Sequence, residues 1–332
     1  MARYWGFWTR GKLELLRRYL DAFTTTTKNK STERIYLDVF GGQPENRDRL
    51  TNDLLAGSAR IALSIDDPSF TRLRFLEVEP YATRLRSALD QEFPRRDFRV
   101  VAGDCNTTIH ATLQDLAQLN WAPTFAFVDP NGPDTHWSTI EALAAFKRKD
   151  RPKTEIWLLF AAGMFMRNLR TDGSVRPEDA DQLTKMFGTD QWRAIYAARV
   201  SGDLTPADAR DEYVNLMRSR LEQVLGYKWT HPLEVFNEHG SSIYHMIFAT
   251  DHPVGTEIMT SLYTTALAEF PAMRQAARQQ RARLEEEAVG VHTLFGKQLD
   301  ELTAPLRRGE RFYEYTPPTP PYGSSEPKDT DT

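Results

Sequence analysis

Four short apolar runs in this sequence each end in an acidic residue. The acids are Asp38, Glu77, Asp104 and Asp129, and a glycine or proline stands within three residues of each. In an open α/β sheet, ligands bind at the edge where parallel strands end. Carboxylates gathered at that edge can accept hydrogen bonds from hydroxyl and amino groups, so the pattern predicts a pocket for a polar organic ligand.

The order of these residues along the chain predicts which part of a ligand each would hold. The glycine pair at residues 41–42 allows the backbone to approach a ligand closely. Glu77 follows one strand later, where an acid suits bidentate hydrogen bonding to a ribose diol. Asp104 is placed to accept from an exocyclic amine, and Asp129 to face the reacting end. We therefore predict a nucleoside cofactor that carries a reactive group.

Two other nucleotide folds fit the sequence less well. A dinucleotide site would show G-x-G-x-x-G after the first strand, whereas this chain has Gly41-Gly42-Gln43-Pro44. The sequence contains no G-x-x-x-x-G-K-[ST], which excludes a P-loop. Acids after the second, third and fourth strands, with a closing hairpin, favour a methyltransferase that uses S-adenosylmethionine (SAM). The predicted fold is α/β, a Rossmann-like class I methyltransferase sheet, mostly parallel with an antiparallel final hairpin.

The elements that would position these acids alternate along the chain. Apolar, β-rich runs at 35–40, 73–77, 98–101, 125–128 and 155–160 are separated by stretches with helical spacing. This alternation predicts βαβ units and a parallel sheet that is covered on both faces.

A helical lobe and a hairpin are predicted beyond the fifth strand. Residues 167–227 lack a convincing strand, and Thr205 and Pro206 have the residue types of a helix start. The runs 233–236 and 243–250 predict an antiparallel hairpin. We expect five segments: an N-terminal helix and linker (1–34), a SAM-binding core (35–166), an inserted helical lobe (167–230), the closing hairpin and helix (231–290), and a C-terminal extension (291–332), disordered from about residue 316.

Composition limits the function classes. The chain has 332 residues and a formal net charge of −4, which argues against a strongly cationic nucleic-acid or membrane binder. Its single cysteine, Cys105, excludes a disulfide framework and a Cys-rich zinc site, and the spacing of His, Cys and carboxylates indicates no metal site. No uncharged apolar stretch approaches the ~20 residues that span a bilayer, and no signal-peptide pattern is present. We expect a cytoplasmic protein.

Several short motifs follow one another in an order that carries a family resemblance. The longest are Tyr-Leu-Asp-Val-Phe-Gly-Gly at 36–42, Gly-Asp-Cys-Asn at 103–106 and Phe-Val-Asp-Pro-Asn-Gly at 127–132. Together with shorter motifs, they resemble the three-Cys-motif partner proteins (TcmP), a bacterial family with a class I methyltransferase-like core. The shorter motifs are Trp8-Thr9, Lys12-Leu13, Tyr19-Leu20, Gly57-Ser58, Ala62-Leu63, Phe75-Leu76-Glu77, Tyr244, residues 247–252 and Met259.

The resemblance implies a cofactor, a partner and site roles. It implies SAM binding and association with a radical-SAM-like protein that carries the three-cysteine motif. The positions that it implies around SAM are Asp38, Phe40, Gly41 and Gly42 by the methionine part, Glu77 at the ribose, Asp104 and Cys105 beside the adenine, and Asp129 at the methyl-transfer end.

The chain departs from the family pattern at two positions. Pro44 stands where the family usually has a second glycine, and Asn131 stands where it often has phenylalanine. Both positions lie where cofactor and substrate are expected to meet. These departures keep open an alternative function, that of a non-catalytic interaction subunit with a methyltransferase fold.

The remaining predictions concern the acceptor side. We expect Asp129 and Asn131 to be catalytic, with Asp129 orienting an amine acceptor, and Lys12, Trp137 and Arg167 to contact the substrate.

A third alternative, a nucleic-acid-modifying methyltransferase, depends on the basic run at residues 147–153. That run is typical of a solvated loop, although it could contact phosphate. The alternative requires a continuous basic face that joins the run to the pocket.

Overall fold

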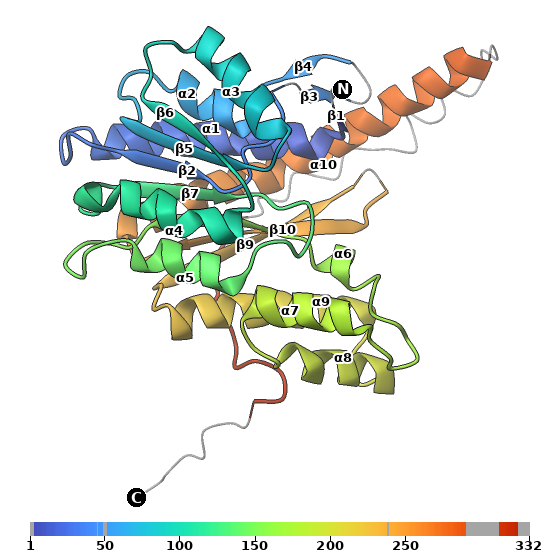
Figure 1. Ribbon diagram of the computed structural model, residues 1–332. Helices are drawn as coiled ribbons and strands as arrows, with labels where there is room; N and C mark the ends of the chain where they lie inside the picture. The colour runs from blue at the N-terminus through green and yellow to red at the C-terminus, as the bar shows by residue number, and fades with distance from the viewer. Residues whose placement is uncertain (1–2, 45, 49–51, 238, 290–311, 325–332) are drawn as a thin grey trace, which may run out of the picture.

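The structure is a computed structural model of the 332-residue chain, and it describes all residues except 1–2, 45, 49–51, 238, 290–311 and 325–332. A seven-stranded sheet in the order β6-β5-β2-β7-β8-β10-β9 forms its centre (Figure 1). Its strands are β2 (Ile35–Asp38), β5 (Arg72–Glu77), β6 (Phe98–Ala102), β7 (Thr124–Val128), β8 (Glu155–Phe160), β9 (Trp229–Phe236) and β10 (Ser242–Thr250).

Strand directions confirm the predicted α/β class. From β6 through β5, β2 and β7 to β8, each pair of neighbours is parallel, whereas β10 runs antiparallel to β8 and β9. The sheet is therefore mostly parallel and ends in the predicted antiparallel hairpin. β2, β7 and β8 are buried along their whole length, which explains why their sequences are continuous apolar runs without alternation.

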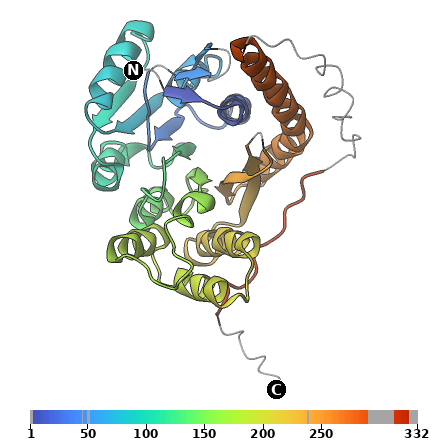
Figure 2. The ribbon, with the colours of Figure 1, turned by 90° about the vertical axis from the view of Figure 1, so that its right-hand side faces the viewer.

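Helices cover both faces of the sheet, as Figures 1 and 2 show. Two buried hydrophobic clusters, one on each face, hold them there. No helix among the described residues combines the length and the apolar character that crossing a membrane requires. One face carries α1 (Phe7–Thr27), α2 (Ser58–Ser64), α3 (Tyr81–Glu92) and α10 (Pro253–Val289), and the other carries α4 (Cys105–Asp115), α5 (Trp137–Ala145) and the helices after β8.

The segment between β8 and β9 is helical throughout its regular structure. It contains α6 (Ala162–Phe165), α7 (Pro177–Phe187), α8 (Trp192–Ser201) and α9 (Pro206–Ser219), and a π-helical turn at Arg220–Val224 ends it. As predicted, Thr205 caps α9 and Pro206 begins it, with Asp208 completing a capping box. Phe187 lies 5.8 Å from Phe160 of β8, ring centre to ring centre, so the lobe shares one hydrophobic core with the sheet.

A second, small sheet was not predicted from the sequence. It joins β1 (Arg3–Trp5), β3 (Asn46–Asp48) and β4 (Leu54–Leu55), with β1 parallel to β3. These strands are two or three residues long and β3 is wholly polar, so no period-two apolar pattern marks them in the sequence. They tie the start of the chain to the segment that follows β2.

The C-terminal segment at residues 312–324 differs from the prediction of disorder from about residue 316. The backbone N–H of Thr319 donates to Asn215 of α9 at 2.9 Å, and the Arg218 guanidinium donates to the Thr316 carbonyl. Tyr313 and Tyr315 pack against the ring of buried His231, with centroids 5.7 and 5.2 Å away. The prolines that suggested disorder instead suit an extended segment that lies on α9 and β9. Residues 325–332 lie outside the described residues.

A buried acid connects three elements at the edge of the sheet where β7 and β8 begin. Glu155, the first residue of β8, is almost fully buried, and it accepts a hydrogen bond from Tyr19 of α1 at 2.6 Å. Thr250, the last residue of β10, donates to its other oxygen at 2.8 Å. Burial raises the pKa of Glu155 to about 7, while the Tyr19 and Thr250 hydroxyls oppose the rise.

This acid makes stability depend on pH in a defined direction. The folded pKa lies above the ordinary value of 4.5, so the stabilising effect of the neutral form is complete below that value and is lost as pH rises through about 7. The shift corresponds to roughly 3 kcal/mol. Between pH 5 and pH 8, we therefore expect the wild type to lose about 3 kcal/mol more unfolding free energy than Glu155→Gln, as measured by urea denaturation. The exposed Glu79→Gln is the matched control, and equal losses in all three proteins would contradict this prediction.

Candidate functional site

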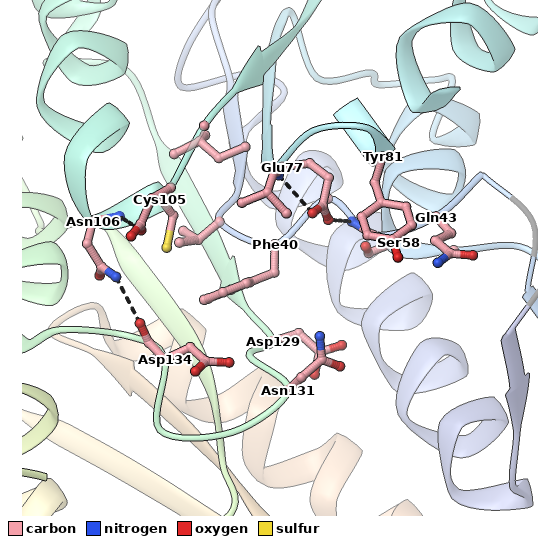
Figure 3. A pocket seen from close by; sticks show the side chains of 18 of the residues that line it. Phe40, Gln43, Ser58, Glu77, Tyr81, Cys105, Asn106, Asp129, Asn131 and Asp134 are labelled. Carbon is pink, nitrogen blue, oxygen red and sulfur yellow. Dashed lines mark hydrogen bonds between the residues drawn. The ribbon is translucent and has the colours of Figure 1, made fainter. Parts of the chain in front are cut away.

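A pocket of about 440 Å³ opens at the edge where the parallel strands end. Figure 3 shows side chains from all four of the predicted strand ends around it. The segments after β2, β5, β6 and β7 each contribute residues, because parallel strands bring their carboxyl ends to one edge. The predicted residues that line it are Lys12, Phe40, Gly41, Gly42, Glu77, Asp104, Cys105, Asp129 and Asn131.

The turn after β2 and the acid after β5 form one hydrogen-bonded unit. The backbone N–H of Gly42 donates to Oε2 of Glu77 at 2.7 Å, and that of Val78 donates to Oε1 at 2.8 Å (Figure 3). Gly42 has φ +72°, a left-handed conformation that favours glycine. Each carboxylate oxygen has two acceptor sites, so both oxygens of Glu77 can accept another hydrogen bond from a ligand.

Pro44 lies beyond the wall of this pocket. The residues of the turn that line the pocket are Gly41, Gly42 and Gln43, while the Pro44 carbonyl accepts a hydrogen bond from Arg60 of α2. The proline that departs from the family pattern therefore lies outside the part of the turn that lines the pocket.

Asp104 caps a helix with one carboxylate oxygen, and its other oxygen can still accept a hydrogen bond. It is the N-cap of α4, and its Oδ1 accepts from the backbone N–H of Asn106 at 2.8 Å. The helix cap fixes the carboxylate at the pocket wall. Its second oxygen still has the capacity to accept from a ligand amine.

Asn106 is a site residue that sequence reasoning missed. Its Nδ2 donates to the carbonyl of Asp134 at 2.8 Å (Figure 3). Its Oδ1 accepts from the backbone N–H of His136 at 2.9 Å and from the Thr139 hydroxyl at 2.8 Å. One amide thus holds the start of α4 against the loop between β7 and α5. The Gly-Asp-Cys-Asn motif at residues 103–106 is the sequence signal for this residue, but the predicted site includes only Asp104 and Cys105 from it.

Cys105 is buried and lines the pocket beside Asp104. Burial, and then the negative charge of Asp104, raise the pKa of the Cys105 thiol to about 12. The thiol is therefore neutral near pH 7, so it forms part of the wall and is a poor nucleophile.

Asp129 and Lys12 form an ion pair at the pocket. Lys12 Nζ lies 2.5 Å from Asp129 Oδ2, and the lysine is only 7% exposed. The ammonium also lies 5.9 Å from the ring centre of Phe127 and 6.0 Å from that of Tyr244. The predicted substrate-side lysine thus faces the predicted catalytic acid, and the pair joins α1 to the segment after β7.

Asp38 does not line the pocket, which corrects its predicted place beside the cofactor. It is fully buried at the end of β2, where the Tyr36 hydroxyl donates to Oδ2 at 3.2 Å and the backbone N–H of Phe40 donates to Oδ1 at 3.3 Å. Burial raises the pKa of Asp38 to about 7, and the charge of Asp129 adds to the rise, whereas the Ser58 hydroxyl opposes it. Asp38 therefore lies in the core behind the pocket wall, where it accepts a hydrogen bond from the backbone of the lining residue Phe40.

Two predicted substrate-side residues lie away from this pocket. Trp137 begins α5 with its ring in the core, donates from Nε1 to Glu141 at 2.7 Å, and is covered by the Arg220 guanidinium. Arg167 is exposed, and its Nε donates to the carbonyl of Gly163 at 3.1 Å. The apolar face of α5 explains the burial of Trp137, which the neighbouring loop sequence does not reveal.

Other lining residues come from three helices that lie far apart in the sequence. Ser58 begins α2, Tyr81 begins α3, and Gln182 reaches the pocket from α7 of the lobe. Gln182 Nε2 donates to Asp134 at 3.4 Å. Burial, and then the charge of Asp104, raise the pKa of Asp134.

The lining is rich in acids. Glu77, Asp104, Asp129 and Asp134 outnumber the cations on the described wall, so the pocket favours a ligand with positive charge. In the part of the chain that the structure describes, no group of three or more His, Cys, Asp or Glu residues has the arrangement of a metal site. The arrangement can bind hydroxyl and amino groups and a cation, and its described side chains include no activated nucleophile.

Comparisons with known proteins found similarity among solved structures. No family model matches the chain, and no curated protein matches it. The methyltransferase domain of bacterial CtHen1 is similar in two crystal structures, CtHen1-C and CtHen1-CN, both at 13% sequence identity. The TM-scores are 0.32 and 0.33; the matches cover 71% of this chain and 98% and 99% of the other chains.

Proposed function

We propose that this protein binds SAM in the pocket at the strand ends and transfers its methyl group to an acceptor. The observation that carries the proposal is the meeting of Glu77, Asp104 and Asp129 around one pocket, beside the Gly41-Gly42 turn. A volume of about 440 Å³ lies within the range of cofactor sites.

The residues present fit the parts of SAM. Both oxygens of Glu77 can accept from a ribose diol while they keep their bonds to Gly42 and Val78. The uncapped oxygen of Asp104 can accept from the adenine amine. Asp134, which also lines the pocket, supplies negative charge that stabilises the cationic groups of SAM. Bound SAM supplies an electrophilic methyl group, and the chain supplies position and charge.

The ion pair of Lys12 and Asp129 bears on the acceptor. Methyl transfer needs alignment of the acceptor with the sulfonium more than it needs a strong base. Asp129 Oδ1 can accept a hydrogen bond from an acceptor amine while Oδ2 stays paired with Lys12. Asn131 stands two residues later on the same pocket wall and offers a second polar group. This arrangement supports an amine acceptor that Asp129 orients.

The resemblance to TcmP supports a further proposal, that the protein acts beside a radical-SAM-like partner with the three-cysteine motif. One observation also favours the alternative of a non-catalytic subunit: Lys12 already neutralises the acid proposed for catalysis. The nucleic-acid alternative is disfavoured, because the basic run at residues 147–153 precedes β8 and lies at the opposite edge of the sheet from the pocket.

Ligand binding tests the cofactor assignment directly. By isothermal titration, we expect the wild type to bind SAM and S-adenosylhomocysteine, and Glu77→Gln to bind both at least about tenfold more weakly, since an amide offers one acceptor oxygen in place of two. Glu79→Gln, which changes an exposed acid outside the pocket, should bind like the wild type. Absence of binding to the wild type at millimolar concentrations would overturn the proposal and favour the subunit role.

Turnover tests the role of Asp129. With tritiated SAM and a panel of small amines, we expect Asp129→Asn to lower methyl transfer by about a hundredfold, because the amide cannot orient the amine as a carboxylate does. The dissociation constant for SAM should change by less than about threefold, because Asp129 is assigned to the acceptor end. A variant that retains wild-type turnover would remove Asp129 from the mechanism.

A further inference from the structure

A second pocket, of about 290 Å³, lies at the opposite edge of the sheet. In Figure 1 this is the left-hand edge, where α1 ends and where β7, β8 and α10 begin. Among the described residues, none lines both pockets: this one includes Thr26 of α1, Thr124 of β7, Glu155 of β8 and Gly255 of α10. It is therefore a separate feature of the fold, and a ligand bound in it would be independent of the proposed methyl transfer.

The second pocket is lined by four cations: Lys30, Lys147, Arg151 and Lys153. Lys153 pairs with Asp251 at 3.3 Å, and Arg151 lies 3.8 Å from Asp150. Among the described residues, neither Lys30 nor Lys147 forms an ion pair with a carboxylate; Lys147 donates to the carbonyl of Ala122. Positive charge at this pocket thus exceeds the negative charge that faces it.

Burial and the neighbouring cations lower pKa values at this pocket in the same direction. Burial, and then the charge of Arg151, lower the pKa of Lys147 to about 8. The pKa of His252, another lining residue, is lowered by burial and by Lys30. Cations that outnumber the nearby carboxylates are stabilised when an anion binds between them.

Part of the remaining wall is apolar and aromatic, and Thr26, Thr27, Ser31 and Thr124 add hydroxyl groups. Phe23 of α1, Trp121 and Pro123 before β7, and Ile258 of α10 contribute ring and aliphatic surface. Glu155 is the one acid in the described lining, and the hydroxyls of Tyr19 and Thr250 already bond to its two oxygens. With a raised pKa of about 7, this acid opposes an anion less than an ordinary carboxylate would. The pocket thus combines apolar and aromatic surface with an excess of cations.

We propose that this second pocket binds a small molecule that has an apolar ring system and one anionic group. The ring packs among Phe23, Trp121 and Ile258, and the anion lies at Lys30, Lys147 and Arg151. A volume near 290 Å³ suits a ligand of one or two fused rings. The basic run at residues 147–153 thereby gains a function as one side of a binding site.

Three probes separate the two parts of this proposal. By isothermal titration, 2-naphthyl phosphate should bind to the full-length protein, whereas 2-naphthol, which lacks the charge, and inorganic phosphate, which lacks the ring, should each bind at least about tenfold more weakly. Equal binding of 2-naphthol would overturn the anionic part. Equal binding of inorganic phosphate would overturn the apolar part. No binding of 2-naphthyl phosphate at millimolar concentrations would overturn the proposal.

A pair of double variants locates the site. Lys30→Gln/Arg151→Gln removes two cations that line the pocket, and Lys28→Gln/Arg148→Gln removes two that do not, from the same two loops and with the same change in net charge. We expect the first to weaken binding of 2-naphthyl phosphate at least about tenfold and the second by less than about twofold. Equal weakening would show attraction by net charge alone and overturn the site. SAM titration should be unchanged in both variants, so failure here is distinguishable from failure of the proposed methyltransferase.

Discussion

The ion pair between Lys12 and Asp129 is the interaction on which the candidate site depends. It joins the N-terminal helix to the end of a central strand, and removal of either side chain would leave the other charge partly buried without its partner. Asp38 lies beneath, and the charge of Asp129 helps to raise its pKa. The two charges of the Lys12–Asp129 ion pair balance each other, and burial favours the neutral form of Asp38. Because little net charge is left, these polar side chains can lie in a largely apolar interior.

Much of the fold could be predicted because its signals are local. Continuous apolar runs mark the buried parallel strands, and the acids at their ends indicated a shared pocket, since parallel strands end at one edge. Glu77, Asp104 and Asp129 were found in this way. The cap and first turn of α9 were found from Thr205 and Pro206, because helix caps also have local chemistry.

What the sequence did not reveal depends on packing between distant segments. Asp38 has the residue type of a ligand-binding acid, yet the pleat of β2 turns its side chain into the core. Trp137 follows the acid-bearing loop closely, yet the apolar face of α5 takes it inward. Gln182 reaches the pocket only because the lobe packs on the sheet. The polar residues of β3 give no strand pattern.

The C-terminal segment has a consequence for how polar side chains at the hairpin edge of the sheet are shielded from water. β10 lies between β8 and β9, and residues 312–324 then cover His231 of β9 and provide a carbonyl for the buried Arg218. Arg218 also donates to Thr230, and His231 lies beside the Thr256 hydroxyl, so residues 312–324 add a second layer of cover to groups already held by β9 and α10. Without this layer, both polar side chains would face water at the surface formed by α9 and β9.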